Sequence, residues 1–170
     1  MERKTLFYLI VGLQIAFLLG MIGMKQSTVL FGQKILLKPM PVDPTDPFRG
    51  DFVTIQYEIS RLDTSLLPPD IENGDTIYVS LQDTGDYWSA AFADRTRNGG
   101  IELKGVVNYV SGNEAWIEYP IDTYFVPKGE GTRDELREFD KLLVEVRVRG
   151  GDAVITNILY DGKPIDFSTP

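Results

Sequence analysis

Two residue types that carry much of protein chemistry are missing, because the chain has no cysteine and no histidine among its 170 residues. Without cysteine there is no disulfide, no thiol nucleophile and no thiolate metal site. Without histidine there is no imidazole ligand and no Ser-His-Asp triad. Any metal would have to be a hard cation held by oxygen atoms. The composition therefore predicts no cofactor of the thiolate or imidazole class.

Positive charge is also scarce. Lysine and arginine number 17 against 25 aspartate and glutamate residues, for a formal net charge of −8. An acidic balance opposes both nucleic-acid phosphates and anionic lipid headgroups. We therefore expect no nucleic-acid partner.

Charge is absent altogether from residues 6–24, where only Gln14 is plainly polar. As a helix this run would span roughly 28 Å, close to the hydrocarbon thickness of a bilayer. A cleaved signal peptide is the alternative, but its apolar core is usually shorter and ends at a small-residue cleavage site. We therefore predict a cytoplasmic arm (1–5), a single-pass transmembrane anchor (6–24) and one extracytoplasmic domain (25–170).

The flanks of the anchor favour one orientation. Arg3 and Lys4 lie directly before the run, whereas only Lys25 lies equally close after it. Basic residues are retained on the cytoplasmic side, so the amino terminus is expected inside and the domain outside the inner membrane of a bacterial cell.

Small residues recur every four positions within the anchor, at Gly12, Ala16 and Gly20. On a helix they share one face, where a second membrane helix could approach closely. The alternative is a lone anchor with its glycines in lipid. The pattern suggests a polytopic membrane protein as partner.

The remaining sequence is typical of a β-rich domain. Residues 51–59 alternate apolar and polar side chains, as a half-buried strand does. Similar patterns predict strands at 74–81, 87–92, 101–110 and 114–125, and a hairpin of 143–148 with 153–160 around Gly150 and Gly151. An apolar segment covers 28–37, a proline-rich loop covers 39–47, and residues 132–141 are predicted to form one short soluble helix. The expected fold class is mostly β, with antiparallel, barrel-like sheets and an N-terminal transmembrane helix.

A motif follows the proline-rich loop. Gly50, Asp51, Phe52, Ile55 and Tyr57 stand in the pattern GDFVTIQY, which resembles the signature of the bacterial GDYxxLxY family of membrane-anchored proteins. Phenylalanine and isoleucine here replace the usual tyrosine and leucine. The resemblance implies an anchored envelope protein, often found beside or joined to polytopic membrane proteins, and it implies no particular reaction. From the residues themselves, we interpret the motif as structural, with Gly50 in a turn and Tyr57 facing inward.

A second stretch is similar to a later glycine-bearing segment of that family. It contains a possible ligand loop of Tyr124, Phe125, Pro127, Gly129, Glu130 and Gly131. Glu130 is the best single candidate for acid or base chemistry, although a solvated glutamate is the simpler interpretation. Asp43, Asp46 and Asp51 are weak candidates for a calcium site, because their spacing does not match an EF-hand.

The main function predicted is binding or assembly, as an accessory to a polytopic membrane protein. The alternative is an extracytoplasmic hydrolase. Met40, Pro41 and Pro44 before a Gly-Asp that opens a strand give a fragmentary resemblance to type I signal peptidases, which use a serine activated by a lysine. Pro39 stands where that serine would be, so no catalytic residue is predicted. Converging carboxylates, or a serine and a lysine in one cleft, would favour the hydrolase.

Overall fold

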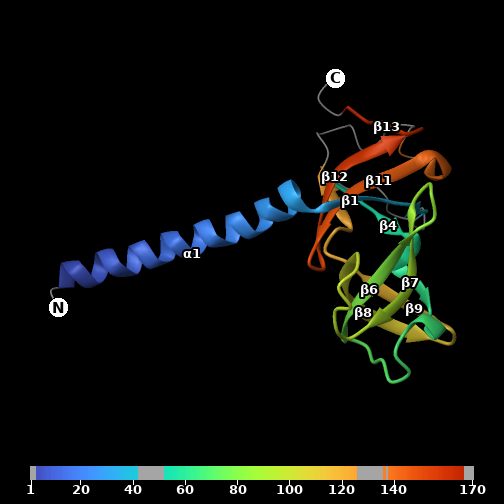
Figure 1. Ribbon diagram of the computed structural model, residues 1–170, viewed down its shortest axis with the longest axis horizontal. Coiled ribbons are helices and arrows are strands. Elements are labelled where there is room, and N and C mark those ends of the chain that lie inside the picture. The colour runs from blue at the N-terminus through green and yellow to red at the C-terminus, as the bar shows by residue number, and fades with distance from the viewer. Residues whose placement is uncertain (1–2, 42–51, 126–135, 137, 167–170) are drawn as a thin grey trace.

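The computed structural model describes residues 3–41, 52–125, 136 and 138–166. A long helix, α1 (Arg3–Phe31), projects from a β-rich domain (Figure 1). It is long and apolar enough to cross a membrane, and none of the residues in its apolar window is buried.

Helix α1 continues beyond Met24, where the apolar run ends, as far as Phe31. The segment 28–37 is therefore not one element, because the end of α1 and strand β1 (Gln33–Leu37) divide it. Gly32 joins them, and its amide donates a hydrogen bond to the carbonyl of Thr28 (2.9 Å). A side chain at Gly32 would collide with that carbonyl, so the close turn requires glycine.

The described strands form two principal antiparallel sheets. One has the order β1-β11-β12-β13, with β11 (Leu142–Arg149), β12 (Asp152–Tyr160) and β13 (Lys163–Pro164). The other has the order β5-β9-β8-β6-β7, with β5 (Arg61–Asp63), β6 (Thr76–Asp83), β7 (Trp88–Asp94), β8 (Glu102–Ser111) and β9 (Glu114–Glu118). This arrangement confirms the mostly β, antiparallel fold class.

Two short strand pairs complete the domain. Strand β2 (Pro39–Met40) pairs with β4 (Gln56–Tyr57), and β10 (Thr123–Phe125) pairs with β3 (Phe52–Thr54). The strand predicted over 51–59 is thus divided, because the chain changes partner at Ile55 and then forms a 3-10 turn, η1 (Glu58–Ser60). A second 3-10 turn, η2 (Thr64–Leu66), follows β5.

The strand predicted over 114–125 is also divided. Strand β9 ends at Glu118 and β10 begins at Thr123 in a different sheet. Pro120 lies between them and has no N–H for a ladder, which accounts for the break. Sequence periodicity continues through this corner because Tyr119 and Ile121 are both buried.

The hairpin of β11 and β12 matches its prediction, with Gly150 and Gly151 both at positive φ (64° and 91°). That backbone suits a two-residue turn between twisted strands. The helix predicted over 132–141 falls largely outside the described residues. Its described end is the 3-10 turn η5 (Phe139–Lys141), preceded by Glu138 in a non-helical conformation.

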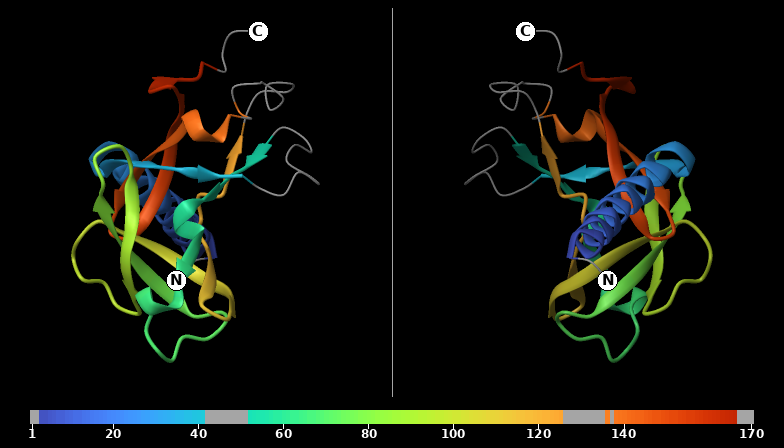
Figure 2. Two further views of the ribbon diagram at one scale, coloured as in Figure 1. Left: turned by 90° about the vertical axis from the view of Figure 1, so that its right-hand side faces the viewer. Right: turned by 90° about the vertical axis from the view of Figure 1, so that its left-hand side faces the viewer.

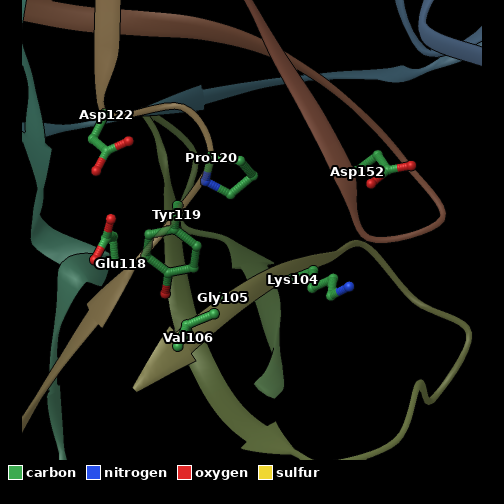
Figure 3. Close-up of a pocket in the computed structure, with 8 residues that line it drawn as sticks. All are labelled: Lys104, Gly105, Val106, Glu118, Tyr119, Pro120, Asp122 and Asp152. Atoms are coloured by element: carbon green, nitrogen blue, oxygen red, sulfur yellow. The ribbon is translucent and has the colours of Figure 1, made fainter. Parts of the chain in front are cut away.

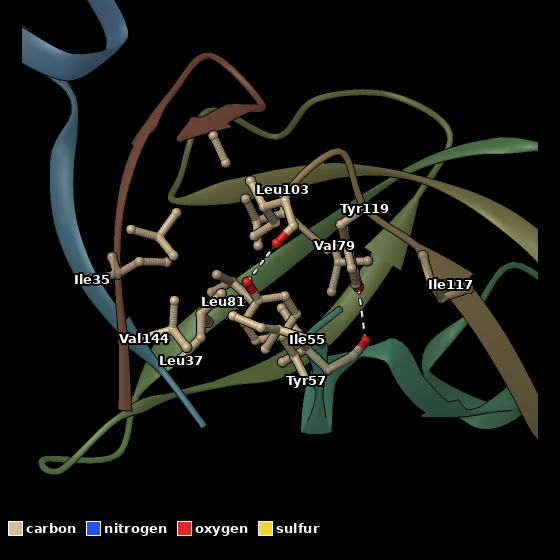
Figure 4. Packing of buried hydrophobic residues seen from close by; sticks show 14 of the residues in the cluster. Ile35, Leu37, Ile55, Tyr57, Val79, Leu81, Leu103, Ile117, Tyr119 and Val144 are labelled. Atoms are coloured by element: carbon tan, nitrogen blue, oxygen red, sulfur yellow. Dashed lines mark hydrogen bonds between the residues drawn. The ribbon is translucent and has the colours of Figure 1, made fainter. Parts of the chain in front are cut away.

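One hydrophobic core joins the two sheets (Figure 4). The four-stranded sheet contributes Ile35, Leu37 and Val144, and the five-stranded sheet contributes Val79, Leu103 and Val107, all almost fully buried. The buried positions of these strands are mainly apolar, but Glu102 on β8 and Glu145 on β11 are buried as well. The core thus unites segments from the whole length of the domain.

Candidate functional site

The motif strands β3 and β4 are held to the corner 119–122 by hydrogen bonds. The Ile55 amide donates to the Asp122 carbonyl (2.7 Å). The Tyr57 hydroxyl donates to the Ile121 carbonyl (2.6 Å), and the Tyr119 hydroxyl donates in return to the Ile59 carbonyl (2.8 Å). Both tyrosine rings are buried. We call this reciprocal pair of bonds the tyrosine clamp.

Burial keeps the clamp in its donor form. Removal from water raises the pKa of the Tyr119 hydroxyl well above its usual value. Burial also raises the pKa of the Tyr57 hydroxyl, and the negative charge of Asp122 adds to the effect. The raised pKa of both hydroxyls favours the protonated form, which donates these two hydrogen bonds.

The corner also borders a cleft of about 630 Å³, which we call the carboxyl cleft. Glu118 and Asp122 lie on one side, with their carboxyl groups directed toward each other, and Lys104 and Asp152 lie on the other (Figure 3). Gly105 forms part of the wall, and a side chain there would meet the Ile117 methyl at 2.5 Å. The close packing of β8 on β9 therefore requires glycine at this position.

The setting of the carboxyl cleft also alters the pKa of Asp122. Partial burial raises the pKa of its carboxyl, and the charge of Glu118 raises it further, although a hydrogen bond from its own backbone opposes the shift. A smaller crevice of about 140 Å³ shares Glu118, Tyr119 and Asp122 and adds Gln56 from the motif strand. The motif thus contributes to the wall of a polar crevice as well as to the core.

Along the chain, the apolar helix α1 comes first, the motif strands β3 and β4 follow, and the corner 119–122 that binds the motif comes last. The family model of the GDYXXLXY proteins matches residues 14–158, which is most of the chain. The protein belongs to the GDYXXLXY family. No curated protein and no solved structure matches it.

The motif residues of this GDYXXLXY protein are only partly described. Gly50 and Asp51 lie outside the described residues, so their predicted turn stays a prediction. The backbone of Phe52 pairs with Phe125. Ile55 and Tyr57 are buried, 7 % and 0 % exposed, as the structural interpretation expects.

The possible ligand loop is described only at its start. Tyr124 is half-buried on β10, and Phe125 ends that strand. Pro127, Gly129, Glu130 and Gly131 lie outside the described residues, as do the weak metal candidates Asp43, Asp46 and Asp51. In the part of the chain that is described, no group of three or more acidic side chains could hold a metal ion.

The hydrolase alternative requires either converging carboxylates or a serine and a lysine in one cleft. Glu118 and Asp122 meet the first condition in the carboxyl cleft. Lys104 lines the carboxyl cleft, whose described lining contains no serine, and Ser60 lines the small crevice, whose described lining contains no lysine. The Ser60 hydroxyl oxygen instead accepts a hydrogen bond from the Tyr57 amide (3.3 Å). These described clefts therefore assemble no Ser-Lys pair.

Several residues of the site were not predicted as site residues from the sequence. Asp122 and Lys104 come together only because β9, β10 and β8 meet at one corner. Pro120 was the available signal, because a proline inside an apparently continuous strand marks an interruption. The side chains next to such an interruption are good candidates for a cleft.

Proposed function

We propose that this protein is a single-pass accessory of a polytopic membrane protein in the bacterial inner membrane, with its β domain on the extracytoplasmic side. The observation that carries the proposal is the exposure of α1. Its apolar side chains are exposed around the whole helix, including Phe7 (62 %), Leu13 (69 %) and Phe17 (67 %). Lipid and a partner helix are the surroundings in which such a helix is stable.

The small-residue face of α1 supports a partner helix. Gly12, Ala16 and Gly20 are exposed, and a Cβ placed on either glycine would have nothing within 4 Å. A helix backbone can approach closely there, and small-residue faces of this kind are common at helix contacts in membranes.

The anchor and the domain are joined without a flexible linker. The Arg147 guanidinium donates to the Gly32 carbonyl (3.1 Å), and Arg149 donates to the Ser27 carbonyl (3.4 Å). Arg149 also lies 5.5 Å from the centre of the Phe31 ring, a cation–π contact. A protein that binds α1 is therefore within reach of the β domain, which suits an assembly role.

Affinity capture of the full-length chain from its native membrane tests the proposal. The wild type should retain a polytopic protein, and Gly12→Leu with Gly20→Leu should reduce its recovery at least several-fold because the added side chains separate the helices. The control, Leu18→Phe with Met21→Phe, adds bulk to the opposite face and should retain the partner. Equal recovery from both double variants, or recovery of the chain alone after gentle extraction, would contradict the accessory role.

A further inference from the structure

The junction between α1 and the domain contains a pocket of about 310 Å³ that the accessory role does not use. Lys25 from the helix lines it, together with Thr123 and Tyr124 from β10 and Val154 and Ile155 from β12. Viewed from the side of the helix, β12 lies beside the end of α1 (Figure 2). We call this the junction pocket.

The position of the junction pocket relative to the bilayer can be inferred from α1. This step rests on the proposed membrane span. If residues 6–24 fill the hydrocarbon layer, Lys25 is the first residue beyond it. The polar layer on each side of the hydrocarbon is roughly 5–8 Å thick. Since the domain contacts the helix from Ser27 onward, it cannot move away from that layer, and the junction pocket opens among the headgroups.

The lining of the junction pocket suits the glycerophosphate part of a lipid. Lys25 supplies a cation, Thr123 and Tyr124 carry hydroxyl groups, and Val154, Ile155 and Pro120 supply apolar wall. Phosphate oxygens accept hydrogen bonds from ammonium and hydroxyl groups, and the ester and first acyl carbons need an apolar contact. Among the described residues that line it there is no carboxylate, although the domain as a whole is acidic.

The neighbouring carboxyl cleft differs from the junction pocket in the charges that line it. It shares Pro120 with the junction pocket, but Glu118, Asp122 and Asp152 line it. With three carboxylates and Lys104, the carboxyl cleft has a net negative lining, whereas Lys25 is the one charged residue in the described lining of the junction pocket. A phosphate is favoured on the side of Lys25 and disfavoured on the side of the carboxylates.

We propose that the junction pocket binds the glycerophosphate group of a membrane phospholipid, with Lys25 paired to the phosphate. The bound lipid would fix the domain against the bilayer surface. The site is a single lipid position at the base of the domain and does not involve the small-residue face of α1.

Photo-crosslinking of the full-length chain in phospholipid vesicles tests this assignment. The probe is a phospholipid with a diazirine near its glycerol backbone, and the crosslinked peptides are located by mass spectrometry. We expect crosslinks to 120–124 and 153–155 in addition to those along 6–24. Lys25→Gln should reduce the crosslinks to the domain several-fold and leave those along the helix unchanged. The control, Lys163→Gln on exposed β13, should change neither.

Crosslinks along the helix serve as the internal standard that separates the two proposals. Helix crosslinks without domain crosslinks, or domain crosslinks unaffected by Lys25→Gln, would overturn the lipid site and leave the anchor intact. An absence of helix crosslinks would overturn the anchor and, with it, the lipid site. Inorganic phosphate should not displace the lipid, and loss of domain crosslinks in its presence would identify a soluble anion as the occupant instead.

Discussion

Helix α1 and the β domain differ in the exposure of their apolar side chains. The apolar window of α1 has a mean hydropathy of 2.2 and no buried residue, whereas the whole chain averages −0.10. The domain, by contrast, buries its apolar residues in one core that joins both sheets. The apolar side chains of the helix therefore lie open to their surroundings, whereas those of the domain core contact one another. The mean hydropathy of the whole chain therefore hides the difference between the two regions.

The largest expected effect tests the dependence of α1 on lipid. Leu13→Arg with Ile15→Arg places two charges at the middle of the span, each at a cost of about 2.5–3.5 kcal/mol for insertion. Most of the protein should then leave the membrane fraction on alkaline carbonate extraction. The control Thr76→Arg, on an exposed position of β6, should remain in the membrane. Retention of the double variant would show that α1 is not the anchor.

The second prediction tests the independence of the domain. Ile77 is fully buried between the sheets, and Ile77→Ala should lower the free energy of unfolding by about 2–5 kcal/mol. Urea unfolding followed by tryptophan fluorescence measures the change, and membrane retention should not alter. Phe92→Ala, at a position 46 % exposed, should change stability by less than about 0.5 kcal/mol. Similar effects at the two positions would contradict the described core.

The third prediction separates the tyrosine clamp from ordinary packing. Tyr57→Phe keeps the buried ring but leaves the Ile121 carbonyl without its donor, which should cost about 1–3 kcal/mol of unfolding free energy. Tyr119→Phe should have a similar effect through the Ile59 carbonyl. The exposed Tyr109 supplies the control, since Tyr109→Phe should be nearly neutral. If all three variants behaved alike, the clamp would contribute nothing beyond packing.

The smallest effect concerns pH. Because the pKa of Asp122 is raised in the folded state, its ionisation opposes folding as pH rises above the ordinary carboxyl value near 3.8. Asp122→Asn should therefore raise the Tm at pH 7, and the difference should disappear below pH 3.8.

Asp63 provides a control of opposite sign. Hydrogen bonds from the Ser65 side chain and amide lower the pKa of Asp63, so its ionised form stabilises the folded state at neutral pH. Asp63→Asn should lower the Tm at pH 7 and have no effect once pH falls through that lowered value. Changes of the same sign in both variants would contradict the assignment for Asp122.

Much of the fold could be predicted from local patterns. The exposed helix, the hairpin of β11 and β12 and the strands β6, β7 and β8 follow from periodicity and turn residues, because these features depend on neighbours in the sequence. The divisions at Ile55 and Pro120 were not predicted. At both places the apolar alternation continues while the backbone changes its pairing partner, and pairing is set by distant segments.

Less of the candidate site could be predicted from the sequence, for the same reason. The motif residues Ile55 and Tyr57 could be identified as inward-facing from alternation alone. The carboxyl cleft and the junction pocket could not, since Lys104 lies on β8, Asp122 lies at the corner before β10, and Lys25 lies on α1. No local pattern records which side chains will share a cleft.

The sequence by itself determined that an uncharged apolar run precedes an acidic β-patterned region without cysteine or histidine, because length, charge and composition are properties of the chain alone. Only the tertiary structure decided that the domain attaches directly to the helix end, that the motif residue Tyr57 bonds the carbonyl of Ile121, and that Lys25 and Asp122 line two pockets that share Pro120. Those facts depend on contacts between distant segments, which arise when burial of the shared core selects one arrangement of the strands.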